Sequence, residues 1–412
     1  MRTSLLGAIL LMGMLGDASG QSPTTLEISV GWSIDGGPYG SSRSLEQTMA
    51  ANKTHVYISG NVTKGDRRHQ VIRLFDAATG RISATIEHPT GAPFDGLGEA
   101  ISANDQFMIT SLHRSAGSND AGAVLVYDAA THKLLREIDN PRQSDSTLFG
   151  LIPPVLYGDR ILASVTVTQD NVATAWVFDA NTGDVVLTLE EPNVDKPLLG
   201  KPKRSFFGRT LAMNGTHIAI TGNDLDAPGG LDMRGIVYVF DATEGTLLHT
   251  LRTPAGEKAS GFGGPLTMTD DTLYIGATEK TGPLDWPTGF IHAYDLGSGV
   301  LKFSIADPGV PQTLDEFSAG KQGWGFPSGI AVAEGLLFSG LPSWSGEESQ
   351  QGGFIVFDAN TGAVRFTYGH RTGVGLDAFG RSLTTTPGGV VVSQSIGKGA
   401  EKAKRVMFLK VN

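Results

Sequence analysis

Apolar and polar residues alternate along most of the chain in short runs, each of the length of a single β-strand. The run from Ile236 to Phe240 is typical, because β-branched and aromatic residues follow one another and polar turns flank them. No segment shows the spacing of an amphipathic helix. The pattern therefore predicts an all-β protein.

One signature recurs six times: an apolar run ends in an aromatic residue and an aspartate, and a turn and a second apolar run follow. The six pairs are Phe75-Asp76, Tyr127-Asp128, Phe178-Asp179, Phe240-Asp241, Tyr294-Asp295 and Phe357-Asp358. The turn usually reads Asp-Ala-x-Thr-Gly. Aspartate accepts hydrogen bonds from backbone N–H groups just after it, and glycine adopts positive φ, so we interpret this motif as structural.

A second signature precedes each copy of the first. An aromatic-Gly pair is followed by an apolar strand, a polar turn and another apolar strand. The pairs are Phe149-Gly150, Phe207-Gly208, Phe262-Gly263, Trp324-Gly325 and Phe379-Gly380, with Leu97-Gly98 as a weaker copy. Residues 45–60 and 207–222 align without a gap. Each repeat therefore predicts four strands, named a to d in chain order.

Successive aspartates of the first signature lie about 51 to 63 residues apart. Four-stranded repeats of this length are typical of β-propeller blades. After six complete repeats, the C-terminus supplies strands a, b and c of a seventh, at residues 380–386, 389–394 and 404–411. The unassigned strand from Leu26 to Trp32 completes that blade if it pairs with residues 404–411. We therefore predict a seven-bladed propeller of four-stranded antiparallel blades, with the last blade closed by the N-terminal strand. Six blades and a disordered tail are the alternative.

The N-terminus has the form of a secretory signal peptide. Arg2 precedes an apolar run from Leu5 to Leu15, and small residues come before Gln21. We expect a signal peptide over residues 1–20 and one propeller domain over residues 21–412, with an uncleaved anchor as the alternative. No later stretch is long enough to cross a bilayer. These features predict a secreted or periplasmic protein.

The net charge limits the classes of partner that the protein can bind, and the cysteine content limits its covalent cross-links. The net charge of −10 argues against nucleic acid, whose phosphates bind basic surfaces. The sequence has no cysteine and so forms no disulfides. We expect a monomer whose partner is a protein or a glycan. Sequons at Asn52, Asn61 and Asn214 predict glycosylation if the source is eukaryotic, although turn propensity explains Asn52 and Asn214 equally well.

At these motifs the chain resembles two related groups of propeller repeats. The Phe-Gly strand and its hairpin resemble the FG-GAP repeat of integrin-type propellers. The Asp-Ala-x-Thr-Gly turn is similar to the repeat of pyrroloquinoline-quinone-type (PQQ-like) propellers. The resemblance covers nearly the whole mature chain, and its motifs concern architecture. Quinoprotein repeats carry a docking tryptophan after the turn, where this chain has Val185-Val186 or Leu247-Leu248.

By analogy with other propellers, the d–a and b–c loops share the face that binds ligands. The d–a loops carry cationic and aromatic residues that suit an anionic ligand, such as a uronic acid polymer. Solvated loop charges are the alternative. The candidate ligand-binding residues are Arg204, Lys258, Lys321, Trp324, His370 and Arg371. Among the histidines, we place only His69, His113 and His370 in loops of this face.

No cofactor is predicted, and no catalytic residue can be named from a motif. Calcium is the one metal considered, because Asp224, Asp226 and Asp232 supply carboxylates in a loop that resembles an incomplete FG-GAP calcium loop. A polar loop without metal is the alternative. The departures from the quinoprotein repeat give a quinone little support.

Three functions follow from the sequence. The scaffold, which carries no familiar catalytic motif, favours a non-enzymatic module that binds a protein or a glycan on its loop face. The alternative is a polysaccharide lyase, or another enzyme acting on anionic glycans, with His370 as base and Arg371 as charge neutraliser. A quinone-dependent dehydrogenase is the third and weakest hypothesis.

Overall fold

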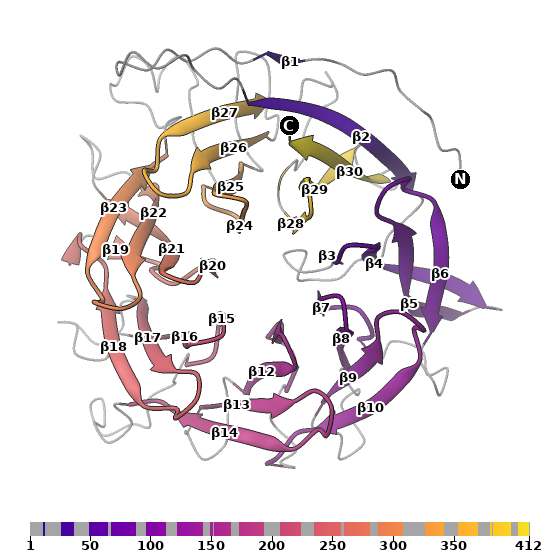
Figure 1. Ribbon diagram of the computed structural model, residues 1–412, viewed down its shortest axis with the longest axis horizontal. Helices are drawn as coiled ribbons and strands as arrows, with labels where there is room; N and C mark the ends of the chain where they lie inside the picture. The colour runs from indigo at the N-terminus through magenta and orange to yellow at the C-terminus, as the bar shows by residue number, and fades with distance from the viewer. Residues whose placement is uncertain are drawn as a thin grey trace.

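Seven antiparallel sheets surround a central axis in the computed structural model (Figure 1). The structure describes residues 11–12, 26–36, 49–64, 67–87, 96–112, 122–142, 149–150, 152–165, 173–192, 207–223, 235–256, 259–280, 287–307, 326–341, 353–369, 380, 382–396 and 403–411. Within this part of the chain every regular element is a β-strand. The prediction of an all-β propeller is confirmed.

Six blades are continuous in sequence, each with strand a innermost and strand d outermost. Blades one to three are β3 (Met49–Ala51), β4 (His55–Lys64), β5 (Arg67–Asp76), β6 (Ile82–Glu87); β7 (Ile101–Ala103), β8 (Phe107–Leu112), β9 (Ala123–Asp128), β10 (Leu134–Asp139); and β11 (Val155–Tyr157), β12 (Arg160–Val165), β13 (Thr174–Asp179), β14 (Val185–Glu190).

Blades four to six are β15 (Leu211–Met213), β16 (His217–Asn223), β17 (Gly235–Asp241), β18 (Leu247–Arg252); β20 (Leu266–Met268), β21 (Thr272–Lys280), β22 (Pro287–Asp295), β23 (Leu301–Ala306); and β24 (Ile330–Ala333), β25 (Leu336–Leu341), β26 (Gly353–Asp358), β27 (Val364–Gly369). In blade five, the short β19 (Ala259–Ser260) also pairs with β21.

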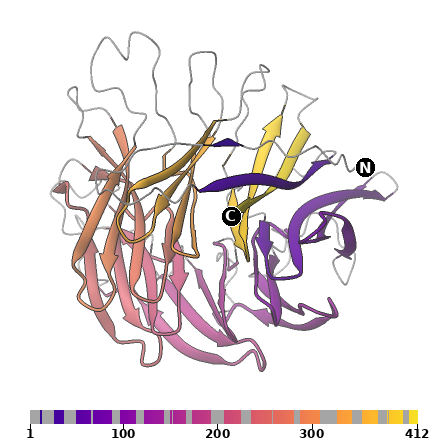
Figure 2. The ribbon, with the colours of Figure 1, turned by 45° about the horizontal axis from the view of Figure 1, so that its top comes forward.

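Blade seven joins the two ends of the chain. Its strands are β28 (Leu383–Thr386), β29 (Gly389–Ile396), β30 (Ala403–Val411) and β2 (Glu27–Gly36), and β1 (Leu11–Met12) pairs with β2. The antiparallel register of β2 and β30 runs from Ile28 opposite Val411 to Gly36 opposite Lys404. Figure 2 shows β2, in indigo, beside the yellow C-terminal strands. The predicted closure is confirmed, and the six-bladed alternative is wrong.

Apolar side chains fill the spaces between neighbouring blades. Tyr57 and Ile72 of blade one pack in one cluster with Leu125 of blade two. In blades two to six the third strand is buried on both faces, whereas the outermost strand is mostly exposed. Burial of a large side chain contributes about 2 kcal/mol, so the core stabilises the ring through contacts between blades.

An aromatic residue enters the core just before strand a. Phe149, Phe207 and Phe262 are fully buried there, as the aromatic-Gly signature predicts. Blade six differs, because Phe326, which precedes Pro327 across a cis peptide bond, is buried in this core. The prediction that Trp324 marks this position is off by two residues, and Trp324 lies outside the described residues.

The aspartate turns behave as predicted. Asp179 Oδ1 accepts hydrogen bonds from the backbone N–H groups of Asn181 and Thr182, at 2.6 and 3.0 Å. Gly183 ends the turn with φ of 84°. Asp76, Asp128, Asp241, Asp295 and Asp358 accept equivalent backbone hydrogen bonds. The motif is therefore a structural turn in every blade that carries it.

Candidate functional site

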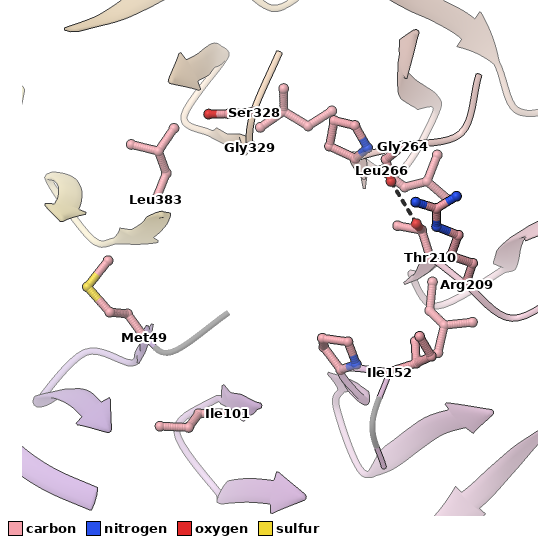
Figure 3. Close-up of a pocket in the computed structure, with 14 residues that line it drawn as sticks. Met49, Ile101, Ile152, Arg209, Thr210, Gly264, Leu266, Ser328, Gly329 and Leu383 are labelled. Atoms are coloured by element: carbon pink, nitrogen blue, oxygen red, sulfur yellow. Dashed lines mark hydrogen bonds between the residues drawn. The ribbon is translucent and has the colours of Figure 1, made fainter. Parts of the chain in front are cut away.

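The innermost strands surround a cavity of about 460 Å³ at the centre of the ring (Figure 3). All seven blades contribute apolar side chains to its wall. These residues are Met49, Ile101, Ile152, Pro153, Leu211, Pro265, Leu266, Ile330 and Leu383. A volume of this size is typical of ligand pockets in proteins.

The repeat explains why the wall is apolar. Four of these residues occupy the same register in their blades, since each lies opposite the fourth residue of strand b: Met49, Ile101, Leu211 and Leu266. Strand a is only three or four residues long in these sheets, so one position per blade dominates the wall. The repeated sequence thus builds a ring of aliphatic side chains.

Arg209 is the one ionisable residue among the described residues that line the cavity. Its side chain is exposed, and it lies between the Phe207-Gly208 pair and β15. The next residue, Thr210, donates a hydrogen bond from Oγ1 to the carbonyl oxygen of Gly264 at 2.7 Å. This bond joins blades four and five beside the guanidinium group, as Figure 3 shows.

A second polar group lines the cavity in blade six. Ser328 Oγ lies 3.4 Å from the carbonyl oxygens of Gly340 and Gly380, which is long for a hydroxyl hydrogen bond. Ser328 precedes strand a by the same number of residues as Arg209 does. The described part of the wall therefore combines an aliphatic ring with the guanidinium group of Arg209 and the weakly bonded hydroxyl group of Ser328.

The predicted loop-face residues lie outside the described part of the chain. These are Arg204, Lys258, Lys321, Trp324, His370 and Arg371, together with the calcium candidates Asp224, Asp226 and Asp232. Among the described residues, no group of three or more His, Cys, Asp or Glu side chains is placed to hold a metal ion. The prediction that His69 lies in a loop is wrong, because this residue lies inside β5 opposite Val62. Strands β4 and β5 stay paired as far as Lys64 and Arg67, so the hairpin includes the segment that was predicted to be a loop.

The a–b turns at the other end of the blades hold neighbouring blades together. Asn52 Nδ2 donates to the carbonyl oxygen of Asn104 at 3.0 Å, and Asn104 Nδ2 donates to that of Gly158 at 2.7 Å. Asn214 Nδ2 donates to Thr269 in the same way, at 2.8 Å. These side chains therefore link consecutive blades.

These hydrogen bonds bear on whether two of the three sequons, at Asn52 and Asn214, are glycosylation sites or turn residues. Asn52 and Asn214 are buried, and their amide nitrogens are engaged in these hydrogen bonds. Asn52 also donates to the hydroxyl oxygen of Tyr57, whose pKa burial raises to about 12. Glycosylation of either asparagine would break the link between blades, so the turn explanation holds for both in the folded protein.

The described residues include no helix that is long and apolar enough to cross a membrane.

Sequence reasoning missed the cavity wall. Arg209 was not predicted because its place in the cavity wall depends on the closed ring, which brings distant parts of the sequence together. The available signal was position: Arg209 directly follows the Phe207-Gly208 pair that introduces an innermost strand.

Three solved structures that are similar to this chain share only 10–13% of its sequence. The polysaccharide lyase Uly1 has a TM-score of 0.53 at 11% identity, covering 98% of this chain and 97% of that chain. The β-propeller domain of the Trilobed protease from Pyrococcus furiosus has a TM-score of 0.50 at 10% identity, covering 87% and 91%. A europium-containing methanol dehydrogenase has a TM-score of 0.45 at 13% identity, covering 93% of each chain. A search of curated proteins gave no match.

The family comparison is more specific than these likenesses. Residues 68–289 match the PQQ-like family model described as outer membrane protein assembly factor BamB. The matched segment spans more than half of the chain and includes the repeats of blades two, three and four. The protein therefore belongs to this family of PQQ-like β-propellers.

Proposed function

We propose that this protein is a binding module, secreted or periplasmic, that holds a segment of a partner protein at the mouth of its central cavity. The observation that carries the proposal is the wall of the cavity, in which aliphatic side chains from all seven blades surround a space bordered by the exposed guanidinium group of Arg209. The family description, which names an assembly factor of the outer membrane, supports a role in protein binding.

The chemistry of the wall favours peptide over sugar. Aliphatic side chains gain free energy by excluding water from an apolar partner, at about 25 cal/mol per Å² of buried surface. Sugars are commonly recognised through aromatic stacking and many polar contacts, and the described lining residues include no aromatic side chain. A peptide with an apolar residue next to an acidic group would match the aliphatic ring and Arg209 together.

Selection of peptides by the purified protein tests this function. We expect short random peptides displayed on phage to be enriched for an apolar residue beside Asp, Glu or a free C-terminus. Arg209→Gln should weaken the selected peptides about tenfold, because a charge-assisted hydrogen bond is lost. Leu266→Asp should abolish binding, since it places a carboxylate in the aliphatic ring.

Arg365→Gln is the matched control, because Arg365 is exposed on the outer strand β27 and does not line the cavity. Circular dichroism would confirm that all three variants fold. Selected peptides that bind equally well to wild type, Arg209→Gln and Leu266→Asp would refute the channel site. Binding of uronic acid polymers with formation of unsaturated products would instead establish the lyase hypothesis.

A further inference from the structure

A buried polar network crosses blade five, away from the central channel. His292 lies on β22 with 1% of its surface exposed, and Glu279 lies on β21 with 4% exposed. His292 Nε2 is 2.8 Å from Glu279 Oε1, and His292 Nδ1 is 2.8 Å from Ser304 Oγ on β23. The serine is exposed, whereas its two partners are not.

The ionised state of Glu279 sets the direction of its hydrogen bond with His292. Burial acts to raise the pKa of Glu279, but hydrogen bonds from His292 and Thr253 outweigh it and hold that pKa below its ordinary value. The ionised carboxylate can only accept, so His292 Nε2 carries the hydrogen that it donates. In the tautomer that carries its one ring hydrogen on Nε2, Nδ1 accepts a hydrogen bond from the hydroxyl group of Ser304. In this form the serine is bonded to an imidazole base that a carboxylate orients.

Packing holds the imidazole in place. Phe290 lies parallel to the ring of His292, with centroids 5.6 Å apart and an interplanar angle of 2°. The ring of Phe262 is tilted by 43° to the imidazole, with centroids 6.0 Å apart. Thr253 Oγ1 donates to Glu279 Oε1 at 2.7 Å, which fixes the carboxylate from blade four. A base held in one orientation is what activation of a hydroxyl nucleophile needs.

The repeat does not require this network. His292 and Ser304 are cross-strand partners on strands c and d. The partners at the equivalent place in the other continuous blades are Arg73 and Thr85, Leu125 and Glu137, Trp176 and Thr188, Tyr238 and Thr250, and Ile355 and Thr367. None of these pairs joins a hydroxyl group to an imidazole, so blade five departs from a position that the fold fills in other ways.

We propose that Ser304 is a nucleophile, with His292 as its general base and Glu279 as the orienting carboxylate, and that it accepts acyl groups from small activated carboxylic esters. Ser304 Oγ attacks the carbonyl carbon while its proton passes to His292 Nδ1. The bond to the leaving alcohol breaks, and the alcohol takes that proton. Water then attacks the acyl-serine with the same base, and the carboxylic acid leaves. We name small esters because Ser304 is exposed on β23, the outermost strand of blade five, where such a molecule can reach it.

A fluorophosphonate probe tests the nucleophile on the full chain. Ser304 Oγ forms a bond to phosphorus as fluoride leaves, and mass spectrometry of the peptide that contains Ser304 detects the adduct. We expect labelling of Ser304 in the wild type. His292→Gln should slow it at least about a hundredfold, the usual contribution of a general base. Ser304→Ala should remove the adduct and the hydrolysis of p-nitrophenyl acetate.

The neighbouring blade supplies a matched control. Thr250 is exposed and lies opposite Tyr238, so Thr250→Ser presents a serine at the equivalent place without an imidazole. In that variant the wild-type Ser304 and the new serine compete for the probe in one molecule. Faster labelling of Ser304 supports the proposal, whereas equal labelling of the two serines overturns it. This comparison needs no change to the buried histidine, so it does not depend on His292→Gln folding.

Discussion

His55 and His132 face each other where blades one and two meet, with ring centroids 4.9 Å apart and planes nearly perpendicular. His132 occupies the last place of an aspartate turn, where most other blades have glycine, and it adopts φ of 58°. Burial lowers the pKa of His55 below 6.5, His132 lowers it further, and Asp76 opposes the shift. The folded protein therefore favours the neutral form of His55.

This depression predicts that acid destabilises the protein. The unfolded chain takes up a proton on His55 near pH 6.5, while the folded protein does so only at lower pH. The contribution of neutral His55 to the free energy of unfolding is thus fully present above that pH and decreases as pH falls below it. Urea unfolding at about pH 8 and about pH 5 measures how much the free energy of unfolding falls in acid. This acid loss should be smaller for His55→Gln than for the wild type.

His217 gives an independent check, because burial also lowers its pKa in the equivalent turn of blade four. His217→Gln should reduce the acid loss separately, and the two effects should add because the sites lie in different blades. An acid loss unchanged in both variants would show that neither histidine contributes.

At the scale of the strand, glycine at the start of strand c sets how closely two blades approach. A side chain on Gly235 would collide with the backbone carbonyl of Phe262, which belongs to blade five. Gly289 meets Phe326 in the same way, one blade further on. Because the obstacle is backbone, it cannot move aside as a flexible side chain would.

Gly235→Ala should therefore destabilise the protein by about 1–3 kcal/mol through overpacking. The matched control is Gly297→Ala, because Gly297 is exposed, meets only the carboxylate of Asp295 and corresponds to Ala78 of blade one. The control should change stability by less than about 0.5 kcal/mol. Urea unfolding compares the two variants, and equal midpoints would contradict close packing at Gly235.

The strands were predictable because their signals are local. An aromatic-Asp pair and a glycine turn fix the c–d hairpin, so the blades and their order follow from the sequence. Phe326 was missed because Trp324-Gly325 also fits the aromatic-Gly pattern, and only packing against Gly289 distinguishes the two. Arg209 and His292 were missed for another reason: their neighbours come from other strands and blades, and spacing along the chain does not reveal such contacts.

At the scale of the whole molecule, the ring is closed by strand β2. Trp32 of this strand donates from Nε1 to the carbonyl oxygen of Ala77 in blade one, at 2.7 Å. Trp32 and Ile34 pack with Val56 and Phe75 of blade one, while Ile28 of the same strand packs with Phe354 of blade six. One strand therefore completes the core on both sides of blade seven.

Moving β2 to the other end of the chain tests this role. Ile28 lies opposite Val411 at the end of β30, so residues 26–36 can follow Val411 through a short turn copied from another blade. This permuted chain would make blade seven continuous, like the other six. We expect it to unfold cooperatively at a melting temperature close to that of the wild type, because every contact between blades is retained.

A chain that lacks residues 26–36 altogether is the necessary comparison. It would expose the edge of β30 and the apolar partners of Trp32 and Ile28 in blades one and six, which invites pairing with other chains. We expect this deletion to aggregate or to unfold at a much lower temperature, measured by light scattering and thermal circular dichroism. A deletion as stable and monomeric as the permuted chain would mean that the ring holds without its closing strand, and that contacts among the first six blades suffice.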